Sequence, residues 1–367
     1  MRTLHLGDAA SPHLRRVVQA LSERGVEQRI FTLNSGAENA GYAPGIRIVR
    51  HVTAARGRDV SKLRYLLALP ALRRELEAYG PDIVHAHYAT SYGLLGALCG
   101  HRPLVISAWG SDVLLFPGKS PLHRRMLAWV LGRGQRVLVI SEVLERAVSR
   151  LTRTPVTRAP FGVDTVQFHP HRATCPYFAA GTLVIGTIKS LEPVYRIGVL
   201  LDAFSRIVRS RPTADLGLLI CGDGSLRQEL EERCAHLGIA DRVRFTGRVS
   251  PDRVAEHHAM IDVFANLSAS ESYGVSVLES MATARPVVAT NVGGLPELVV
   301  HDVTGLLVAP DDVQATAEAI GRLVDDDALR ARMGAAGRER VLAVFDRRSH
   351  DGICAAVYEE LLQPRAR

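Results

Sequence analysis

Short apolar runs alternate along the first half of the chain with segments that place apolar residues at helical spacing. The runs predict buried strands at 3–6, 28–33, 46–51, 83–85, 104–107 and 136–140. The segments between them predict helices at 12–24, 62–79 and 91–99, and Gly80 with Pro81 stops the second helix. Alternation of this kind predicts a parallel sheet with helices on both faces.

The alternation breaks at 160–170, and an interdomain linker is predicted at about 163–180. A second series then predicts strands at 183–187, 216–221, 243–246, 261–267 and 287–289, with helices at 199–209, 226–237 and from Val275 to before Pro286. A last helix is expected at 350–362. The length of 367 residues also favours two domains. We therefore predict an α/β protein with two doubly wound, Rossmann-like domains at 1–165 and 166–345, and a terminal segment at 346–367.

The charge is divided unevenly between the two halves. Residues 1–165 hold 23 Lys and Arg against 12 Asp and Glu, whereas the rest holds 22 against 26. A basic first half favours a polyanionic partner, such as an anionic bilayer or a phosphorylated glycolipid. Nucleic acid is not expected, because the chain has no recognisable nucleic-acid module or aromatic stacking platform.

The segment 123–136 has basic ends around an apolar centre, which is typical of a helix on a membrane surface and also of a packed helix with basic flanks. No run of about 18 apolar residues predicts a membrane span. No signal peptide is apparent, since Met1 leads directly into a strand. The five cysteines are scattered without a CxxC pair, which favours reduced thiols. We expect a cytoplasmic protein, compatible with a peripheral position on the inner face of the plasma membrane.

The segment 261–290 carries the clearest candidate chemistry. It predicts a buried strand, a small polar loop with Glu271 and Gly274, a helix with Glu279, and a second strand. The start of such a helix has unpaired N–H donors and a partial positive charge, which favour phosphate. Carboxylates repel phosphate but accept hydrogen bonds from hydroxyls. Glu279 lies about five residues into the helix, roughly 7–8 Å along its axis. The pattern therefore suits a nucleotide sugar.

The same segment resembles the Glu-x7-Glu signature of retaining glycosyltransferases of family 4, which have the GT-B fold. The resemblance extends to Ser-Tyr-Gly between the glutamates, Arg-Pro-Val-Val-Ala-Thr at 285–290, and Val-Gly-Gly-Leu-Pro-Glu at 292–297. It implies two domains that face each other across a cleft, with the terminal helix returning to the first. It also implies that Glu279 holds the ribose, that Glu271 holds the donor sugar, and that no metal or other cofactor is required. The amides of Gly274, Val275 and Ser276 would hold the diphosphate.

Three further candidates follow strands of the second domain, where ligands of parallel sheets bind. Gly222 and Gly224 permit close backbone approach, and the resemblance places them beside the donor nucleotide. The resemblance likewise places Arg248 beside the base of the donor nucleotide, although a plain turn would look the same in sequence.

The third candidate is Lys189, which can neutralise charge on a departing diphosphate. The family supplies a second cation five residues on, where this chain has Val194. Arg196 is the candidate to replace it through its longer reach.

The first domain offers residues for the acceptor. Gly7, Asp8 and His13 follow the first strand, where similar enzymes bring acceptor and donor phosphate together. Many family members have a histidine near the reacting sugar where this chain has Trp109. Asp112 follows it and suits either a contact with a sugar hydroxyl or the N-cap of a helix.

His85 and His87 point the same way in an extended chain. A metal site needs a third ligand, and the sequence indicates none nearby. We therefore favour one packed histidine, with His87 lining the cleft, and expect no metal site.

These features predict a retaining glycosyltransferase that moves a sugar from a nucleoside diphosphate sugar to a hydroxyl of a glycan or lipid-linked acceptor, in envelope or extracellular polysaccharide synthesis. Glu271, Lys189 and Asp112 are the candidate catalytic residues. Two alternatives stay open: a nucleotide-sugar epimerase on the same fold, and a non-catalytic subunit of a polysaccharide assembly system. The sugar, the base, the acceptor and the oligomeric state are not determined by the sequence.

Overall fold

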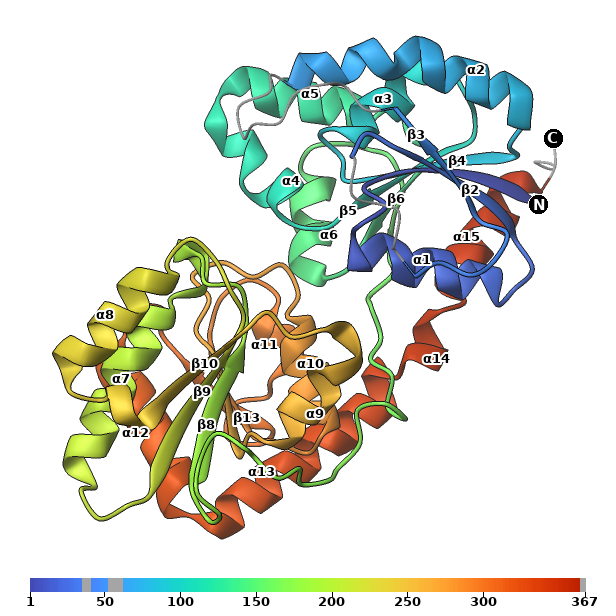
Figure 1. Ribbon diagram of the computed structural model, residues 1–367. Coiled ribbons are helices and arrows are strands. Elements are labelled where there is room, and N and C mark those ends of the chain that lie inside the picture. Colours follow the sequence, from blue (N-terminus) through green and yellow to red (C-terminus); the bar gives the residue numbers. More distant parts are fainter. Residues whose placement is uncertain (35–40, 52–61, 364–367) are drawn as a thin grey trace. The chain divides into compact units, whose positions relative to one another are not determined.

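The computed structural model describes residues 1–34, 41–51 and 62–363. The chain forms two compact units (Figure 1). Unit 1 comprises Met1–Phe161 together with Arg348–Arg367, and unit 2 comprises Gly162–Arg347. Each unit contains one parallel sheet with helices on both faces, so the predicted pair of doubly wound α/β domains is confirmed.

Unit 1 is built on a seven-stranded parallel sheet in the order β3-β2-β1-β4-β5-β6-β7. The central strand β1 pairs with β2 on one side and β4 on the other. Residues of β4 and β5 are buried on both faces of the sheet, as near-continuous apolar strands require. The strands are β1 Arg2–Leu6, β2 Glu27–Thr32, β3 Arg47–Arg50, β4 Ile83–His87, β5 Leu104–Ala108, β6 Arg136–Val139 and β7 Val156–Arg158.

Helices cover both faces of this sheet. In Figure 1, α1 and α15 lie on one face, and α2, α3 and α5 lie on the other. The predicted helix at 62–79 begins as a 3-10 segment, Lys62–Ala68, and becomes α-helical only where Pro70 stands in the first turn. The helices are α1 Pro12–Ser22, α2 Leu69–Tyr79, α3 Tyr92–Cys99, α4 Ser111–Leu114, α5 Pro121–Leu131, α6 Glu142–Ser149 and α15 Ile353–Leu362.

The terminal helix α15 packs into the core of unit 1. Tyr358 is fully buried, and its hydroxyl lies 2.6 Å from Nδ1 of His85 in β4. Cys354, Ala355 and Val357 join the same apolar cluster as residues of α1 and the central strands. The last helix thus completes one face of the sheet that the first 160 residues begin.

Unit 2 is built on a six-stranded parallel sheet in the order β10-β9-β8-β11-β12-β13. In Figure 1, α7, α8 and α12 cover one face, and α9, α10, α11 and α13 lie on the other side. The strands are β8 Leu183–Ile188, β9 Leu216–Cys221, β10 Val243–Gly247, β11 Val263–Asn266, β12 Val287–Thr290 and β13 Gly305–Val308. The helices are α7 Ile197–Ser210, α8 Arg227–Leu237, α9 Val254–Ala259, α10 Val275–Ala282, α11 Leu295–Leu298, α12 Val313–Asp325 and α13 Asp327–Arg340.

The two passages of the chain between the units run side by side. Val163 donates to the carbonyl of Phe345 (2.9 Å), and Arg347 donates to the carbonyl of Val163 (3.0 Å). A Cβ at Gly162 would lie 2.3 Å from Cα of Arg347, so this crossing requires glycine. The short helix α14, Arg347–His350, follows directly. The backbone hydrogen bonds make the two passages a single paired connection.

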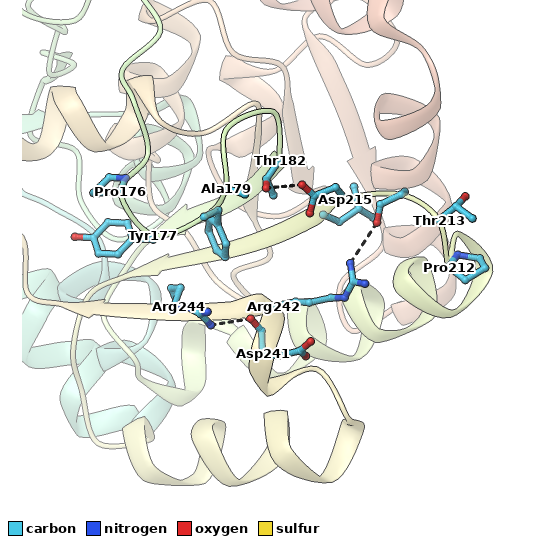
Figure 2. A pocket seen from close by; sticks show the side chains of 13 residues that line it. Pro176, Tyr177, Ala179, Thr182, Pro212, Thr213, Asp215, Asp241, Arg242 and Arg244 are labelled. Atoms are coloured by element: carbon cyan, nitrogen blue, oxygen red, sulfur yellow. Dashed lines mark hydrogen bonds between the residues drawn. The ribbon is translucent and has the colours of Figure 1, made fainter.

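A shallow hollow of about 530 Å³ lies at the amino ends of β8, β9 and β10 (Figure 2). Four of its polar side chains, those of Thr182, Asp215, Arg242 and Arg244, already have protein partners. Thr182 donates to Asp215 (2.7 Å), Arg242 donates to the carbonyl of Ala214 (3.2 Å), and Arg244 donates to the carbonyl of Asp241 (2.9 Å). Ligands of parallel sheets bind at the opposite edge, and the candidate residues of unit 2 lie there.

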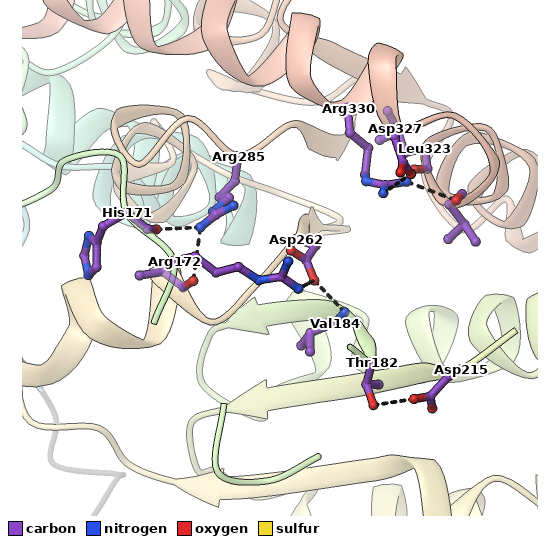
Figure 3. A network of polar contacts seen from close by, with 12 residues as sticks. His171, Arg172, Thr182, Val184, Asp215, Asp262, Arg285, Leu323, Asp327 and Arg330 are labelled. Atoms are coloured by element: carbon purple, nitrogen blue, oxygen red, sulfur yellow. Dashed lines mark hydrogen bonds and ion pairs between the residues drawn. The ribbon is translucent and has the colours of Figure 1, made fainter. Parts of the chain in front are cut away.

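Polar contacts fasten the segment that precedes β8 to the rest of unit 2 (Figure 3). Arg285 donates to the carbonyl of His171 (2.6 Å), and Arg172 lies 3.4 Å from Asp262. The carboxylate of Asp262 also accepts from the backbone of Val184 (2.9 Å). The predicted linker is therefore anchored to unit 2 along much of its length.

Candidate functional site

The loop between β11 and α10 is positioned by glycines. Gly274 precedes α10 with φ +105°, which favours glycine, and a Cβ there would lie 2.7 Å from Leu295. A Cβ at Gly293 would lie 1.8 Å from the carbonyl oxygen of Glu271, and Gly294 donates to that oxygen (3.0 Å). The loop that carries Glu271 thus rests directly on the backbone after β12.

Glu271 and Lys189 form a close ion pair at the carboxyl edge of this sheet. Nζ of Lys189, just after β8, lies 2.6 Å from Oε2 of Glu271, and each side chain is only 13% exposed. The ring of Tyr195 lies 5.0 Å from the same ammonium group. The sequence did not indicate Tyr195 as a site residue, because nothing in the local pattern shows that it covers Lys189.

Opposing effects act on the carboxyl group of Glu271. Burial alone would raise its pKa, but the charge and hydrogen bond of Lys189, with the backbone N–H of Tyr273, hold the pKa below its ordinary value. Glu271 is therefore a carboxylate at neutral pH. It can accept hydrogen bonds from a ligand hydroxyl but cannot donate a proton.

The start of α10 offers donors for an anion. Val277 and Leu278 donate to the carbonyl of Gly274, and no side chain among the described residues caps the helix. Oγ of Ser276 is buried and has no hydrogen-bond partner in the part of the chain that the structure describes. The N–H groups at a helix start have no partner within the helix. The site thus presents a hydroxyl and backbone N–H groups together.

Glu279 lies one turn further along α10 and is 8% exposed. Its Oε2 atom lies 3.4 Å from Nε2 of His258 in α9. The two glutamates of the motif therefore differ in surroundings: Glu271 faces a lysine, and Glu279 faces a buried imidazole. His258 was not singled out in the sequence, since it lies 21 positions from Glu279.

Gly222 and Gly224 are required by contacts within the protein. A Cβ at Gly222 would lie 1.8 Å from the carbonyl oxygen of Lys189, and one at Gly224 would lie 2.5 Å from that of Leu191. The backbone N–H of Lys189 in turn donates to the carbonyl of Cys221 (2.9 Å). The two glycines thus let the backbone of the loop after β8 approach closely. This contact fixes the backbone position of Lys189.

Arg196 and Val194 have separate partners. Nε of Arg196 lies 2.8 Å from Oδ1 of Asp311, and its Nη1 donates to the carbonyl of Pro193 (3.0 Å). Ala269, in the loop that leads to Glu271, donates to the carbonyl of Val194 (2.8 Å). The guanidinium group is thus paired with a carboxylate of the β13–α12 loop, so its use by a ligand requires that pair to open.

Arg248 is exposed directly after β10. The preceding Gly247 has φ +75°, and its carbonyl accepts from Gly222 (2.8 Å). This hydrogen bond joins the ends of β9 and β10. Arg248 consequently stands at the same edge of the sheet as Lys189.

The first strand of unit 1 ends in a tight turn. Gly7 donates to the carbonyl of Phe31 (3.1 Å), and a Cβ there would lie 2.9 Å from Leu14. Asp8 accepts from the backbone of Ala10 (3.0 Å) through one carboxylate oxygen. This contact holds the turn that leads into α1.

Aromatic rings gather at this edge of unit 1. His13 stacks on Phe161 with ring centroids 4.9 Å apart and meets Trp109 edge-on at 5.4 Å. Trp109 also lies 5.3 Å from the ring of His87. Trp109 therefore packs between two histidines, which supplies an apolar surface where similar enzymes carry a histidine.

Asp112 does not have the predicted role. Its carboxylate is fully buried and accepts from the backbone of Ala89 (2.8 Å), Gly110 (2.9 Å) and Trp109 (3.2 Å). These bonds use both oxygens to tie the loop after β4 to the loop after β5. Asp112 thus positions Trp109 and does not face a sugar hydroxyl. It does not cap α4 either, because its partners precede that helix.

A network around buried histidines links the four strands β1, β2, β4 and β5, and it includes a residue that sequence reasoning missed. His5 in β1 places Nδ1 2.9 Å from Nε2 of His87 and Nε2 2.9 Å from Oε1 of Gln28. His85 contacts Tyr358 and the hydroxyl of Ser107 (2.7 Å). His5 was overlooked because it lies 80 positions before His85. The expectation that no third imidazole lies nearby was wrong.

The tautomers in this network follow from Gln28. Its amide nitrogen donates to the carbonyl of Val18 (3.0 Å), so its Oε1 must face His5 and Nε2 of His5 must carry the proton. Burial lowers the pKa of His5 to about 4 and also lowers that of His87. Both rings are neutral, so His87 donates from Nε2. Its buried Nδ1 is a bare acceptor without a partner among the described residues.

The geometry of the three histidines favours hydrogen bonds over metal coordination. Nitrogen atoms of His5, His85 and His87 lie within 4.8 Å of one another. Two ligand nitrogens about 2.0–2.1 Å from a tetrahedral zinc ion are more than 3 Å apart, whereas those of His5 and His87 are 2.9 Å apart. Both nitrogens of His85 are also engaged. A metal ion would therefore have to displace existing hydrogen bonds.

Two family profiles match the chain. The profile described as "Glycosyl transferase 4-like" matches residues 2–141, and "Glycosyl transferases group 1" matches residues 178–340. D-inositol 3-phosphate glycosyltransferase of Nocardia farcinica is 30% identical over 363 residues, covering 89% of this chain and 80% of that protein. The GDP-mannose-dependent alpha-(1-6)-phosphatidylinositol monomannoside mannosyltransferase of Mycobacterium tuberculosis is 30% identical over 331 residues, covering 83% and 81%.

Solved structures share the fold over the whole length. Sucrose-phosphate synthase from Thermosynechococcus elongatus superimposes with a TM-score of 0.86 at 20% identity, covering 98% of this chain and 99% of that one. Anabaena Alr3699/HepE in complex with UDP-glucose superimposes with a TM-score of 0.81 at 22% identity, covering 98% of this chain and 100% of that one.

Proposed function

Since the chain belongs to glycosyltransferase family 4, with the GT-B fold, we propose that it transfers a sugar from a nucleoside diphosphate sugar to a hydroxyl of a glycan or glycolipid, with retention of anomeric configuration. The observation that carries this proposal is the group of polar residues at the carboxyl edge of unit 2. The Lys189–Glu271 pair lies there with the uncapped start of α10.

Each part of the donor has a matching group in unit 2. The diphosphate binds the N–H groups of Gly274, Val275 and Ser276, where the helix dipole favours negative charge. Glu271, held as a carboxylate, accepts from the sugar hydroxyls. Glu279, one helix turn away, accepts from the ribose hydroxyls.

Lys189 supplies the main catalytic effect. As the bond between sugar and diphosphate breaks, negative charge grows on the leaving oxygen, and a buried ammonium group stabilises it. Glu271 is paired with this lysine, so it serves as a hydrogen-bond acceptor and not as a nucleophile. We propose that the acceptor hydroxyl attacks from the face that the diphosphate leaves, and that the departing phosphate takes its proton. No metal is needed, because the lysine and the helix dipole carry the charge.

The acceptor is assigned to the carboxyl edge of unit 1. Gly7 and Asp8 form a tight turn there, and the rings of His13 and Trp109 offer an apolar surface of the kind that packs against a sugar ring. Nδ1 of His87 is a free acceptor among the described residues, but His87 is only 1% exposed, so a hydroxyl would reach it only after a side chain moves. A glycan or lipid-linked sugar of envelope or extracellular polysaccharide fits this surface.

The donor is tested by thermal stabilisation in EDTA. The panel contains UDP, GDP, UDP-glucose and GDP-mannose, since similar proteins are named with both nucleotides. We expect one nucleoside diphosphate and its sugar conjugate to raise the melting temperature, and Glu279→Ala to abolish that shift. Loss of one carboxylate–hydroxyl bond corresponds to about 1.5–3 kcal/mol, or roughly 10- to 100-fold in affinity.

Arg206→Ala is the matched control, because Arg206 is exposed on α7 and its side chain bonds to Gln314. It should retain the full shift. Slow hydrolysis of the matching donor without acceptor would then separate a transferase from a non-catalytic binding subunit. The absence of any shift over the whole panel would refute the donor assignment.

A further inference from the structure

The segment 113–141 contains no acidic residue. It carries Lys119, Arg124, Arg125, Arg133 and Arg136 within 29 residues. Arg136 is paired with Glu360, but no ion pair to the other four is found within residues 1–34, 41–51 and 62–363. Four cations without a carboxylate partner thus share one short stretch of unit 1, which includes α4, the 3-10 turn Phe116–Lys119 and α5.

One face of α5 is packed, as an ordinary helix would be. Leu127, Val130 and Leu131 are buried in unit 1. The face about 160° away around the helix carries Leu122, Arg125 and Trp129, spaced three and four residues apart. The interpretation as a packed helix with basic flanks is confirmed for the inner face, whereas the interpretation as a membrane-surface helix stays a prediction for the outer face.

The outer face exposes large apolar side chains beside its cations. Leu122 is 74% exposed, and Leu115, just before the 3-10 turn, is 54% exposed. Trp129 is 41% exposed, and the guanidinium carbon of Arg133 lies 4.9 Å from its ring centroid. A tryptophan beside an arginine suits the boundary between apolar and polar surroundings, where one part of each side chain stays hydrated.

We propose that this surface, formed by Leu115, Lys119, Leu122, Arg125, Trp129 and Arg133, docks on an anionic lipid bilayer. The leucines and the tryptophan enter the headgroup region, and the three cations of the surface pair with lipid phosphates. Figure 1 shows α5 beside α3 on the same side of the sheet. No helix among the described residues is long and apolar enough to span a bilayer.

The exposed apolar groups favour a bilayer over other polyanions. A nucleic acid would be held by cations and stacked aromatic rings, but Trp129 is the aromatic residue on this surface and Arg133 already covers it. Leu115 and Leu122 offer nothing to a phosphodiester chain. A second copy docked through the same face would place cations opposite cations, because the segment 113–141 has no acidic residue.

The test is co-sedimentation of the full chain with vesicles of phosphatidylcholine alone and of phosphatidylcholine with phosphatidylglycerol. We expect binding to the mixed vesicles that weakens as salt is added, and little binding to the neutral ones. Arg125→Gln with Arg133→Gln should weaken binding to mixed vesicles about tenfold or more. Leu122→Ser should weaken it severalfold without changing the dependence on salt.

Matched controls remove the same groups elsewhere. Arg150→Gln with Arg153→Gln takes two exposed arginines from unit 1 outside this surface, and Val166→Ser removes an equally exposed apolar side chain, 73% against 74%. Both should bind vesicles as the wild type does. All variants should keep the nucleotide-dependent thermal shift, so a failure of this proposal is distinguishable from a failure of the donor assignment.

Three outcomes would overturn the proposal. The first is equal binding to neutral and anionic vesicles, or binding to neither. The second is a loss of single-stranded DNA binding in the arginine variant while vesicle binding persists, which would assign the surface to nucleic acid. The third is self-association in sedimentation without lipid that Leu122→Ser abolishes, which would assign it to a second copy of the chain.

Discussion

Nζ of Lys189 and Oε2 of Glu271 lie 2.6 Å apart, and both side chains are largely shielded from water. The pair joins the end of β8 to the loop before α10, 82 positions further along the chain. In the proposed reaction the lysine must face the donor diphosphate while the glutamate faces the sugar. In that proposed reaction, donor binding replaces one buried ion pair with two new contacts, and until then Lys189 holds Glu271 as a carboxylate.

Replacing Lys189 with methionine removes the charge but keeps most of the volume. We expect kcat for donor hydrolysis or transfer to fall by about 10²–10³, because a positioned group that stabilises developing charge is worth roughly 3–4 kcal/mol. Steady-state kinetics with the donor identified by thermal stabilisation measures this effect. Arg196→Met is the comparison, since Arg196 is paired with Asp311. A loss in Arg196→Met as large as in Lys189→Met would show that Arg196 turns toward the donor as the second cation.

Gly222 offers a test of the backbone that holds Lys189. Its φ is +147°, and a Cβ would lie 1.8 Å from the carbonyl oxygen of Lys189. Gly222→Ala should lower the free energy of unfolding by roughly 2–5 kcal/mol, from left-handed strain together with overpacking. Gly247→Ala is the matched control, because Gly247 has φ +75° but open space around its Cβ position. It should cost only about 1–2 kcal/mol. Equal costs in urea unfolding would refute the steric argument.

The strands were predictable because each buried strand is a local apolar run. The run at 216–221 matches β9 residue for residue, and the run at 183–187 stops one residue short of β8. The edge strand β7, Val156–Arg158, was missed because it is short and only half-buried. The strand β4 extends to His87 where a strand ending at His85 was predicted, since polar residues at its end are buried by neighbours that the local sequence does not specify.

The site was predictable only as far as it follows from local motifs. Glu271, Gly274 and Glu279 belong to one loop and one helix, so their spacing determines where they lie. The partners Tyr195 and His258 come from other elements, and no periodicity indicates them. Asp112 shows the converse, because a carboxylate after a strand looks the same in sequence whether it meets a ligand or three backbone N–H groups.

The contact between α15 and the sheet gives a prediction on stability. The hydroxyl of Tyr358 lies 2.6 Å from Nδ1 of His85 in a fully buried environment. Tyr358→Phe leaves that nitrogen without a partner and should lower the free energy of unfolding by about 1–3 kcal/mol. Tyr177→Phe, at the hollow in unit 2, should change it little. Chemical denaturation measures both, and an unchanged stability in Tyr358→Phe would mean that the hydrogen bond contributes nothing net.

The histidine network predicts how stability depends on pH. Burial lowers the pKa of His5 from 6.5 to about 4, and lowers those of His85 and His87 well below 6.5. At a pH between the lowered pKa of a folded histidine and its ordinary value of 6.5, the unfolded chain binds more protons than the folded chain. The free energy of unfolding therefore falls as the pH falls below 6.5. His5 alone changes the free energy of unfolding by at most about 1.4 kcal/mol per pH unit. Between pH 6.5 and 5 this change amounts to at most roughly 2 kcal/mol.

Urea unfolding at intervals from pH 7.5 to 5 measures this slope. His5→Gln should reduce it by the contribution of one histidine, because a glutamine amide supplies the donor for Gln28 and the acceptor for His87 without titrating. His236→Gln changes an exposed histidine on α8 and should leave the slope as it is. If the wild-type slope were flat over this range, the three rings would have to be protonated in the folded state. In that case Nδ1 of His87 would not be a bare acceptor, because a charged imidazole ring donates from both nitrogens. The tautomer assignment would then be wrong as well.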